Sequence, residues 1–143
     1  MKKILLATAA IGLLFTACKK DDDLPTTTNT WKAGANTRTA TGVSVQNNSL
    51  VATDNANSIT VTFGGTLPTT DGTFRIVGGT PDPGEVSVMV NEGTSVYYST
   101  GNDNKDAKVK VASNKVSVEI PDVWAKNLLG TDSLFVSADL KQP

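Results

Sequence analysis

Apolar and polar residues alternate with a period of two over most of the chain beyond residue 40. Valine, isoleucine, leucine or phenylalanine recurs at every second position, and threonine, serine, lysine or glutamate fills many of the positions between. This alternation is typical of half-buried antiparallel strands. The segments that follow it are 43–45, 59–63, 74–76, 86–90, 109–111, 116–120 and 134–140.

Clusters of Asn, Asp, Gly, Ser and Pro separate these segments at intervals of about 10 residues, which is the rhythm of a sandwich or small barrel. The clusters lie at residues 46–48, 54–57, 71–72, 81–84, 91–93, 101–104 and 113–114. The pattern predicts one all-β domain, a single antiparallel β-sandwich-like fold of about eight or nine strands. A small meander β-barrel is the alternative. We expect segment 134–140 to pair with an early strand, which would close the sheet.

Two segments need a separate interpretation. Residues 122–129 break the alternation, and they predict either a single helical turn or a bulged extended link. Trp31 stands alone at the start of the domain, where we expect it to fill one end of the core.

The first 17 residues have the features of an export signal. Lys2 and Lys3 precede an apolar run at 4–15, which is shorter than the roughly 20 residues that a membrane-spanning helix needs. Thr16 and Ala17 then precede Cys18, the only cysteine of the chain. Residues 14–18 resemble the lipobox of bacterial lipoproteins, which implies a signal peptide at 1–17 and a lipidated Cys18. The alternative is an ordinary secretory signal with an incidental cysteine.

A charged run, Lys19-Lys20-Asp21-Asp22-Asp23, follows the cysteine. It is similar to the surface-export signal of Bacteroidota-type lipoproteins. The similarity implies an outer-membrane lipoprotein on the cell surface, with a periplasm-facing anchor or a plain solvated tether as the alternatives. Residues 18–30 are predicted to be the lipidated cysteine and a flexible tether, and residues 31–143 the β domain.

The domain also resembles a group of small all-β Bacteroidota lipoproteins to which no function has been assigned. The resemblance implies an extracytoplasmic domain and supplies no functional residues. It rests on residues 30–34, 39–43, 67–74, 98–103 and 132–134.

Composition argues against several chemistries. The chain has no histidine, which is the usual general base near neutral pH and the commonest zinc ligand. Once the signal peptide takes Lys2 and Lys3 away, 11 of the 13 basic residues remain against 14 acidic ones. This weakly acidic balance is a poor match for nucleic acid. We therefore expect no enzyme activity and no cofactor, and the enzymatic alternative is a small hydrolase that uses paired carboxylates.

Aromatic residues give the best indication of a binding surface. Tyr97, Trp124 and Phe135 fall outside the apolar faces of their segments, so they are candidates for a ligand patch that stacks on sugars or docks a protein. The alternative is that they cover a second layer of the core. Asp103 and Asp106 are secondary candidates as metal ligands, although a solvated hairpin turn is the favoured interpretation.

The segment Asp132-Ser133-Leu134 matches a short O-glycosylation acceptor pattern, with Ser133 as the acceptor. The alternative is that this serine simply begins a strand.

Taken together, the sequence predicts a lipid-anchored cell-envelope protein, held to the membrane by its N-terminal lipid, that is a non-enzymatic binding or structural component. Its expected partners are a glycan or an envelope protein. The alternative within this class is an accessory glycan-binding module of a polysaccharide-uptake system.

Overall fold

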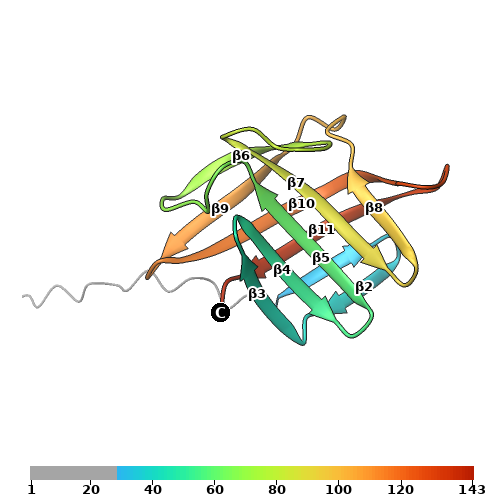
Figure 1. Cartoon of the computed structure of the whole chain (residues 1–143), viewed down its shortest axis with the longest axis horizontal. Helices are drawn as coiled ribbons and strands as arrows, with labels where there is room; N and C mark the ends of the chain where they lie inside the picture. Colours follow the sequence, from blue (N-terminus) through green and yellow to red (C-terminus); the bar gives the residue numbers. More distant parts are fainter. Residues whose placement is uncertain (1–28) are drawn as a thin grey trace, which may run out of the picture.

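The computed structural model describes residues 29–143, and these residues form an all-β domain (Figure 1). The predictions for the signal peptide, Cys18 and residues 19–23 lie outside this range. The strands are β1 (Thr30–Ala33), β2 (Asn36–Thr39), β3 (Gly42–Gln46), β4 (Ser49–Asp54), β5 (Asn57–Phe63), β6 (Gly72–Val77), β7 (Glu85–Glu92), β8 (Ser95–Ser99), β9 (Asp106–Ala112), β10 (Lys115–Asn127) and β11 (Ser133–Lys141). Within residues 29–143 there is no helix that could cross a membrane.

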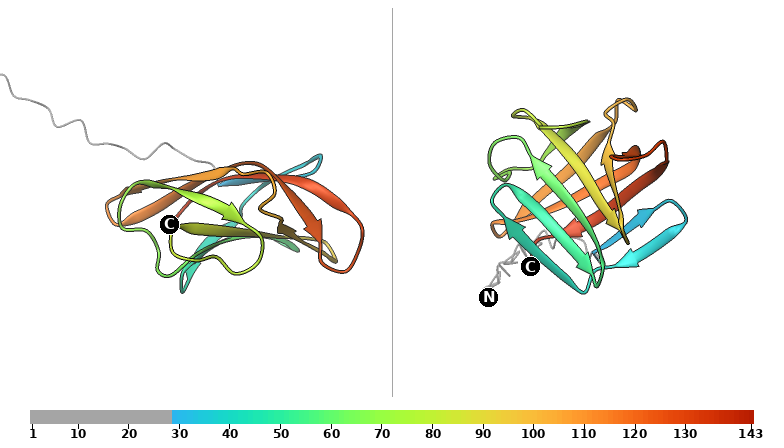
Figure 2. Two further views of the ribbon diagram at one scale, coloured as in Figure 1. Left: turned by 90° about the horizontal axis from the view of Figure 1, so that it is seen from above. Right: turned by 45° about the vertical axis from the view of Figure 1, so that its right-hand side comes forward.

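All eleven strands belong to one mixed sheet, in the order β2-β1-β11-β10-β9-β6-β7-β5-β4-β3. Strand β8 pairs with both β7 and β10, so the pairings of β7, β8, β10, β9 and β6 make a closed circuit. The layer that contains β3, β4, β5 and β7 crosses steeply over the layer that contains β1, β11 and β10 (Figures 1 and 2). The fold is therefore sandwich-like, as the alternation predicts.

Two details differ from the expected meander. Strands β6 and β7 pair in parallel, with Arg75 opposite Glu85, because the connection at residues 78–84 returns the chain beside β6 in the same direction. The structure also has eleven strands instead of eight or nine, since β1 and β2 have only four residues each and β4 contains three consecutive apolar residues, which obscure its alternation. As expected, β11 pairs with the early strand β1, but this pairing does not close the sheet, because β2 and β3 remain as its two edges among residues 29–143.

Residues 122–129 are mostly extended, as the second of the two interpretations predicts. Strand β10 continues to Asn127, and its register against β11 shifts between Ile120 and Val123. Such a bulge inserts an extra residue and bends the strand. Because of this bend, β10 pairs with β9 through its first half and with β8 through its second half.

One core fills the space between the two layers. Its largest fully buried side chain is Trp31, which is 1% exposed, as expected from its isolated position in the sequence. The Trp31 indole N–H is buried, and no partner for it is present among residues 29–143. The inward positions of β5, β7 and β10 supply most of the remaining core.

The layers are also joined at their rim. Arg38 on β2 donates through Nε to Glu92 Oε2 at the end of β7 at 3.0 Å, and it lies 3.6 Å from Asp54. Asn36 donates to the same Glu92 carboxylate at 3.0 Å. The hydrogen bond from Arg38 lowers the pKa of the Glu92 carboxyl below its ordinary value, so this contact is charged at neutral pH.

Candidate functional site on the outer face of β8, β10 and β11

Trp124 on β10 and Phe135 on β11 lie side by side on the outer face of the sheet. They are opposite each other in the register, and their ring centroids are 4.7 Å apart with an interplanar angle of 68°. Phe135 is 51% exposed, whereas Trp124 is partly covered. An edge-to-face pair of this kind is a favourable arrangement that leaves one ring available for a ligand.

The loop between β8 and β9 binds the backbone of Trp124. The Trp124 N–H donates to the Asp103 carboxylate, and the Trp124 carbonyl accepts from the Thr100 N–H at 3.0 Å. These contacts occupy the gap where β10 leaves β9 and has not yet reached β8. The loop therefore fixes the position at which the indole is presented.

One hollow borders Phe135, and a second lies farther along the same face. On the β1 side, Gly34 donates its N–H to the Phe135 carbonyl at 2.8 Å. A hollow of about 490 Å³ lies here, with Lys32, Lys105 and Asp122 on its walls. Its polar groups are two ammonium groups and one carboxylate, which suit a polar ligand with several hydrogen-bonding groups.

The second hollow, of about 510 Å³, lies on the β8 side and is lined in part by Tyr98, Thr100, Lys126 and Leu128. Tyr98 and Lys126 are opposite each other in the β8–β10 register, so their side chains share the outer face. The sequence pattern placed Tyr97, and not Tyr98, outside the apolar face of this segment, and it therefore missed this contribution of Tyr98.

The loop between β10 and β11 carries two strongly exposed leucines. Leu128 is 65% exposed and Leu129 is 94% exposed. Phe135 follows a few residues later, so three of the four large apolar residues that are exposed within residues 29–143 fall between positions 128 and 135. Two adjacent exposed leucines in one loop are a candidate contact for a partner. The sequence predicted either a single helical turn or a bulged extended link for residues 122–129, and it assigned the two leucines no surface role.

Tyr97 does not join this face, which corrects one member of the predicted patch. It is 6% exposed, and its hydroxyl donates to Asp132 Oδ2 at 3.1 Å. The reason is the β8–β10 register, which puts Ser99 opposite the buried Ala125 and so turns Ser99 and Tyr97 inward. Ser99 is tolerated in the core because its hydroxyl accepts from the Val88 N–H at 3.1 Å.

Asp103 and Asp106 are not brought together as a metal site. Asp103 accepts the Trp124 N–H, and Asp106 is an exposed residue at the start of β9. Within residues 29–143 no three His, Cys, Asp or Glu side chains are grouped so that they could hold a metal ion. Asp103 is better described as a cap for the backbone at the bulge.

We expect Asp103→Ala to lower the free energy of unfolding by about 1–3 kcal/mol, because it leaves the partly buried Trp124 N–H without an acceptor. Asp106→Ala is the matched control and should change it by less than about 0.5 kcal/mol. Urea denaturation of both variants gives the comparison. Equal effects of the two substitutions would contradict the capping role.

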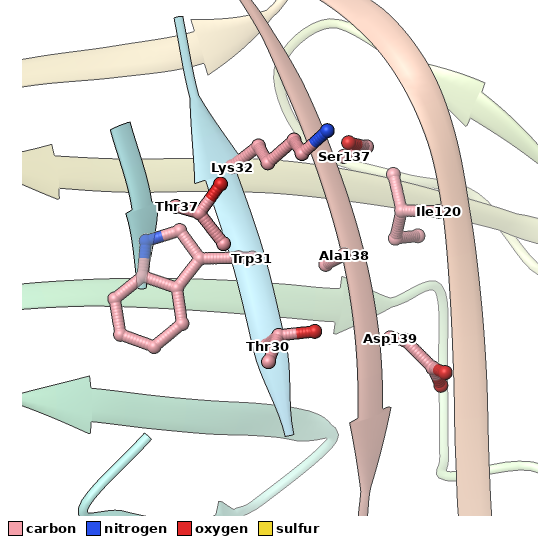
Figure 3. A pocket seen from close by; sticks show the side chains of 8 residues that line it. All are labelled: Thr30, Trp31, Lys32, Thr37, Ile120, Ser137, Ala138 and Asp139. Atoms are coloured by element: carbon pink, nitrogen blue, oxygen red, sulfur yellow. The ribbon is translucent and has the colours of Figure 1, made fainter. Parts of the chain in front are cut away.

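A smaller hollow, of about 240 Å³, lies over β1, β11 and β10 (Figure 3). Asp139 on its wall is opposite Glu119 in the register, so two carboxylates are neighbours on the strand face. Burial raises the pKa of Asp139, and the charge of Glu119 raises it further. Glu119, however, is largely exposed and lies 3.5 Å from Lys108, so it is not enclosed in a cleft with Asp139.

Ser133, the predicted glycosylation acceptor, is half-buried and begins β11. Its N–H donates to Asp132 Oδ1 at 2.9 Å. Its role as an acceptor stays a prediction.

The comparisons with known proteins add no further assignment, because no protein-family model, curated protein or solved structure matches this chain.

Proposed function

We propose that this chain is a lipid-anchored protein of the cell envelope, with a non-enzymatic domain that binds its partner through the outer face of β8, β10 and β11. The observation that carries the binding role is the exposed ring of Phe135, packed edge-to-face on Trp124, together with the exposed Leu128 and Leu129 of the adjoining loop. The lipid anchor is supported by the lipobox-like residues before Cys18 and by the apolar run that precedes them.

The position of this face fits such an anchor. Thr30, where the described chain enters the domain, is opposite Asp139 near the end of β11. The loop with Leu128 and Leu129 precedes Ser133, at the start of β11. At about 3.3 Å per residue these two ends of the strand are roughly 20 Å apart. A tether from Cys18 would therefore enter at one end, and the exposed leucines would lie at the other.

Carbohydrate is the second, more specific candidate for the ligand. Aromatic rings stack on the apolar faces of sugars, and the flanking hollows provide Lys32, Lys105, Lys126 and Asp122 for the hydroxyl and charged groups. The exposed ring of Phe135 is the specific observation that favours this candidate over a purely structural role.

The location of the protein on the cell surface is tested by protease treatment of intact cells, followed by a blot for the released domain. We expect the wild-type chain to be released and a variant with Asp21, Asp22 and Asp23 changed to Ala to be protected. A variant with Glu at the same three positions separates charge from residue identity. Wild-type protein that is digested only after lysis would overturn the surface location, and Cys18→Ser protein that stays in the membrane fraction would overturn the lipid anchor.

The ligand is tested by affinity electrophoresis of the detergent-purified full chain in gels that contain neutral or acidic polysaccharides. We expect Phe135→Ala to weaken the retention about three- to tenfold, since an aromatic contact contributes about 0.5–1.5 kcal/mol. Asp106→Ala on β9 is the control, because Asp106 is exposed and lines neither hollow of this face. Wild-type protein that no polysaccharide retards would exclude the carbohydrate candidate while leaving a protein partner in place.

A further inference from the structure

Strand β3 ends the sheet, and its outer edge has no partner among residues 29–143. It has five residues, Gly42-Val43-Ser44-Val45-Gln46, and it pairs only with β4 (Figure 1). An unpaired edge presents a row of main-chain N–H and C=O groups that can pair with another strand.

The ladder determines which of these groups are free. Asn48 accepts the Phe63 N–H at 3.0 Å, so in β4 the even-numbered residues bond to β5 and the odd-numbered residues bond to β3. Ser44 and Gln46 are opposite Val51 and Ser49, and they use their main-chain groups within the sheet. Val43 and Val45 therefore direct their N–H and C=O groups away from β4.

The edge lacks the features that usually prevent pairing. Strand β3 contains no charged residue and no proline, and its register against β4 is regular. Val45 lies opposite Leu50 of β4, so its side chain is on the same, core-facing side of the sheet. Leu50 is fully buried, whereas Val45 is 37% exposed. The opposite edge, β2, differs because it carries Arg38, which is bound to Glu92.

We propose that β3 pairs antiparallel with β3 of a second copy of this chain, about a twofold axis at Ser44. In this register Val43 of each copy lies opposite Val45 of the other, and these two residues hold the free main-chain groups. The pairing makes four N–H···O=C bonds, and it covers the exposed Val45 side chain with a valine from the partner. Because the strand is uncharged, no like charges meet across the axis.

The register makes a sharp test possible with single cysteines. Ser44 would face Ser44 of the other copy as a non-hydrogen-bonded pair, with Cα atoms about 4.5 Å apart, which is within the range of a disulfide. Gln46 lies on the same face, but its counterpart would be four residues out of register, or roughly 13 Å away. A disulfide cannot bridge that separation.

The experiment is mild oxidation of the detergent-purified full chain, with Ser44→Cys and Gln46→Cys compared on non-reducing gels. The wild-type chain gives the background from Cys18, the only natural cysteine. We expect Ser44→Cys to form covalent dimers at least tenfold above the Gln46→Cys level. Equal cross-linking of the two variants, or none above background, would overturn the proposal.

A second substitution distinguishes cross-links that form through strand pairing from cross-links that form by random collision. In the Ser44→Cys chain, Val45→Lys should abolish the cross-link because it places a charge on the edge, whereas Val45→Thr should preserve it. Val45 is exposed, so neither change threatens the core. A cross-link that survives Val45→Lys would show that the two copies do not meet through this edge.

Discussion

Replacing Trp31 by alanine is expected to lower the free energy of unfolding by about 3–5 kcal/mol, the usual cost of removing a large aromatic side chain from a core. Trp31 is 1% exposed and lies on β1, which is paired on both sides by β2 and β11. The cavity would open next to three strands that cannot easily collapse into it, since their hydrogen bonds fix their spacing. Urea denaturation of wild type and variant measures the difference.

Trp31→Phe is the informative control for this experiment. Phenylalanine keeps most of the apolar volume, and it removes the buried indole N–H that has no partner within residues 29–143. Because an unpaired buried donor itself costs about 1–3 kcal/mol, we expect the loss to be less than half of that for Trp31→Ala. Equal losses for the two variants would mean that packing of the ring does not account for the effect.

Gly64→Ala is expected to lower the free energy of unfolding by about 3 kcal/mol, at the upper end of the range for overpacking. A Cβ atom at Gly64 would lie 1.9 Å from the carbonyl oxygen of Asp82, which is a backbone atom. The two segments approach closely because Gly64 forms a parallel bridge with Pro83 and donates its N–H to Glu85 at 2.9 Å. Accommodating the methyl group would displace the chain that leads into β7.

Gly72→Ala is the matched substitution, because the nearest atom to its Cβ would be a ring carbon of Phe74 at an ordinary 3.5 Å. We expect a change of less than about 1 kcal/mol there, since neither space nor a left-handed backbone opposes the side chain. Thermal unfolding of the two variants gives the comparison directly. If Gly64→Ala unfolded at the wild-type temperature, the close approach at Asp82 would be disproved.

The sequence was most informative where each strand has one buried and one exposed face. Strands β5, β7 and β9 alternate cleanly, and their inward residues are those predicted. Asparagine also identified turns correctly, because Asn47, Asn55 and Asn114 adopt the left-handed conformation that this residue tolerates. The local pattern of apolar and polar residues was therefore sufficient to predict the fold class.

The pattern of apolar and polar residues failed to predict strands whose position or orientation depends on contacts with distant parts of the chain. Strand β2 has no apolar residue, and it is held by main-chain pairing with β1 and by the Arg38–Glu92 contact. Strand β8 faces the opposite way from the prediction, because a buried serine can satisfy its hydroxyl through the backbone of a neighbouring strand. The candidate site was found in part: Trp124 and Phe135 were identified, but Leu128 and Leu129 were not, since an exposed leucine has no distinctive local signal.

The pairing of β1 with β11 has a consequence for how the domain forms. Strand β11 is the latest in this sequence, yet it lies inside the sheet between β1 and β10. Trp31 therefore cannot be enclosed until the final residues are available, and the core is completed only by contacts between distant parts of the chain. Folds dominated by such contacts form slowly. In a chain with this topology, the apolar surface around Trp31 would stay open to water until residues 133–141 have been synthesised.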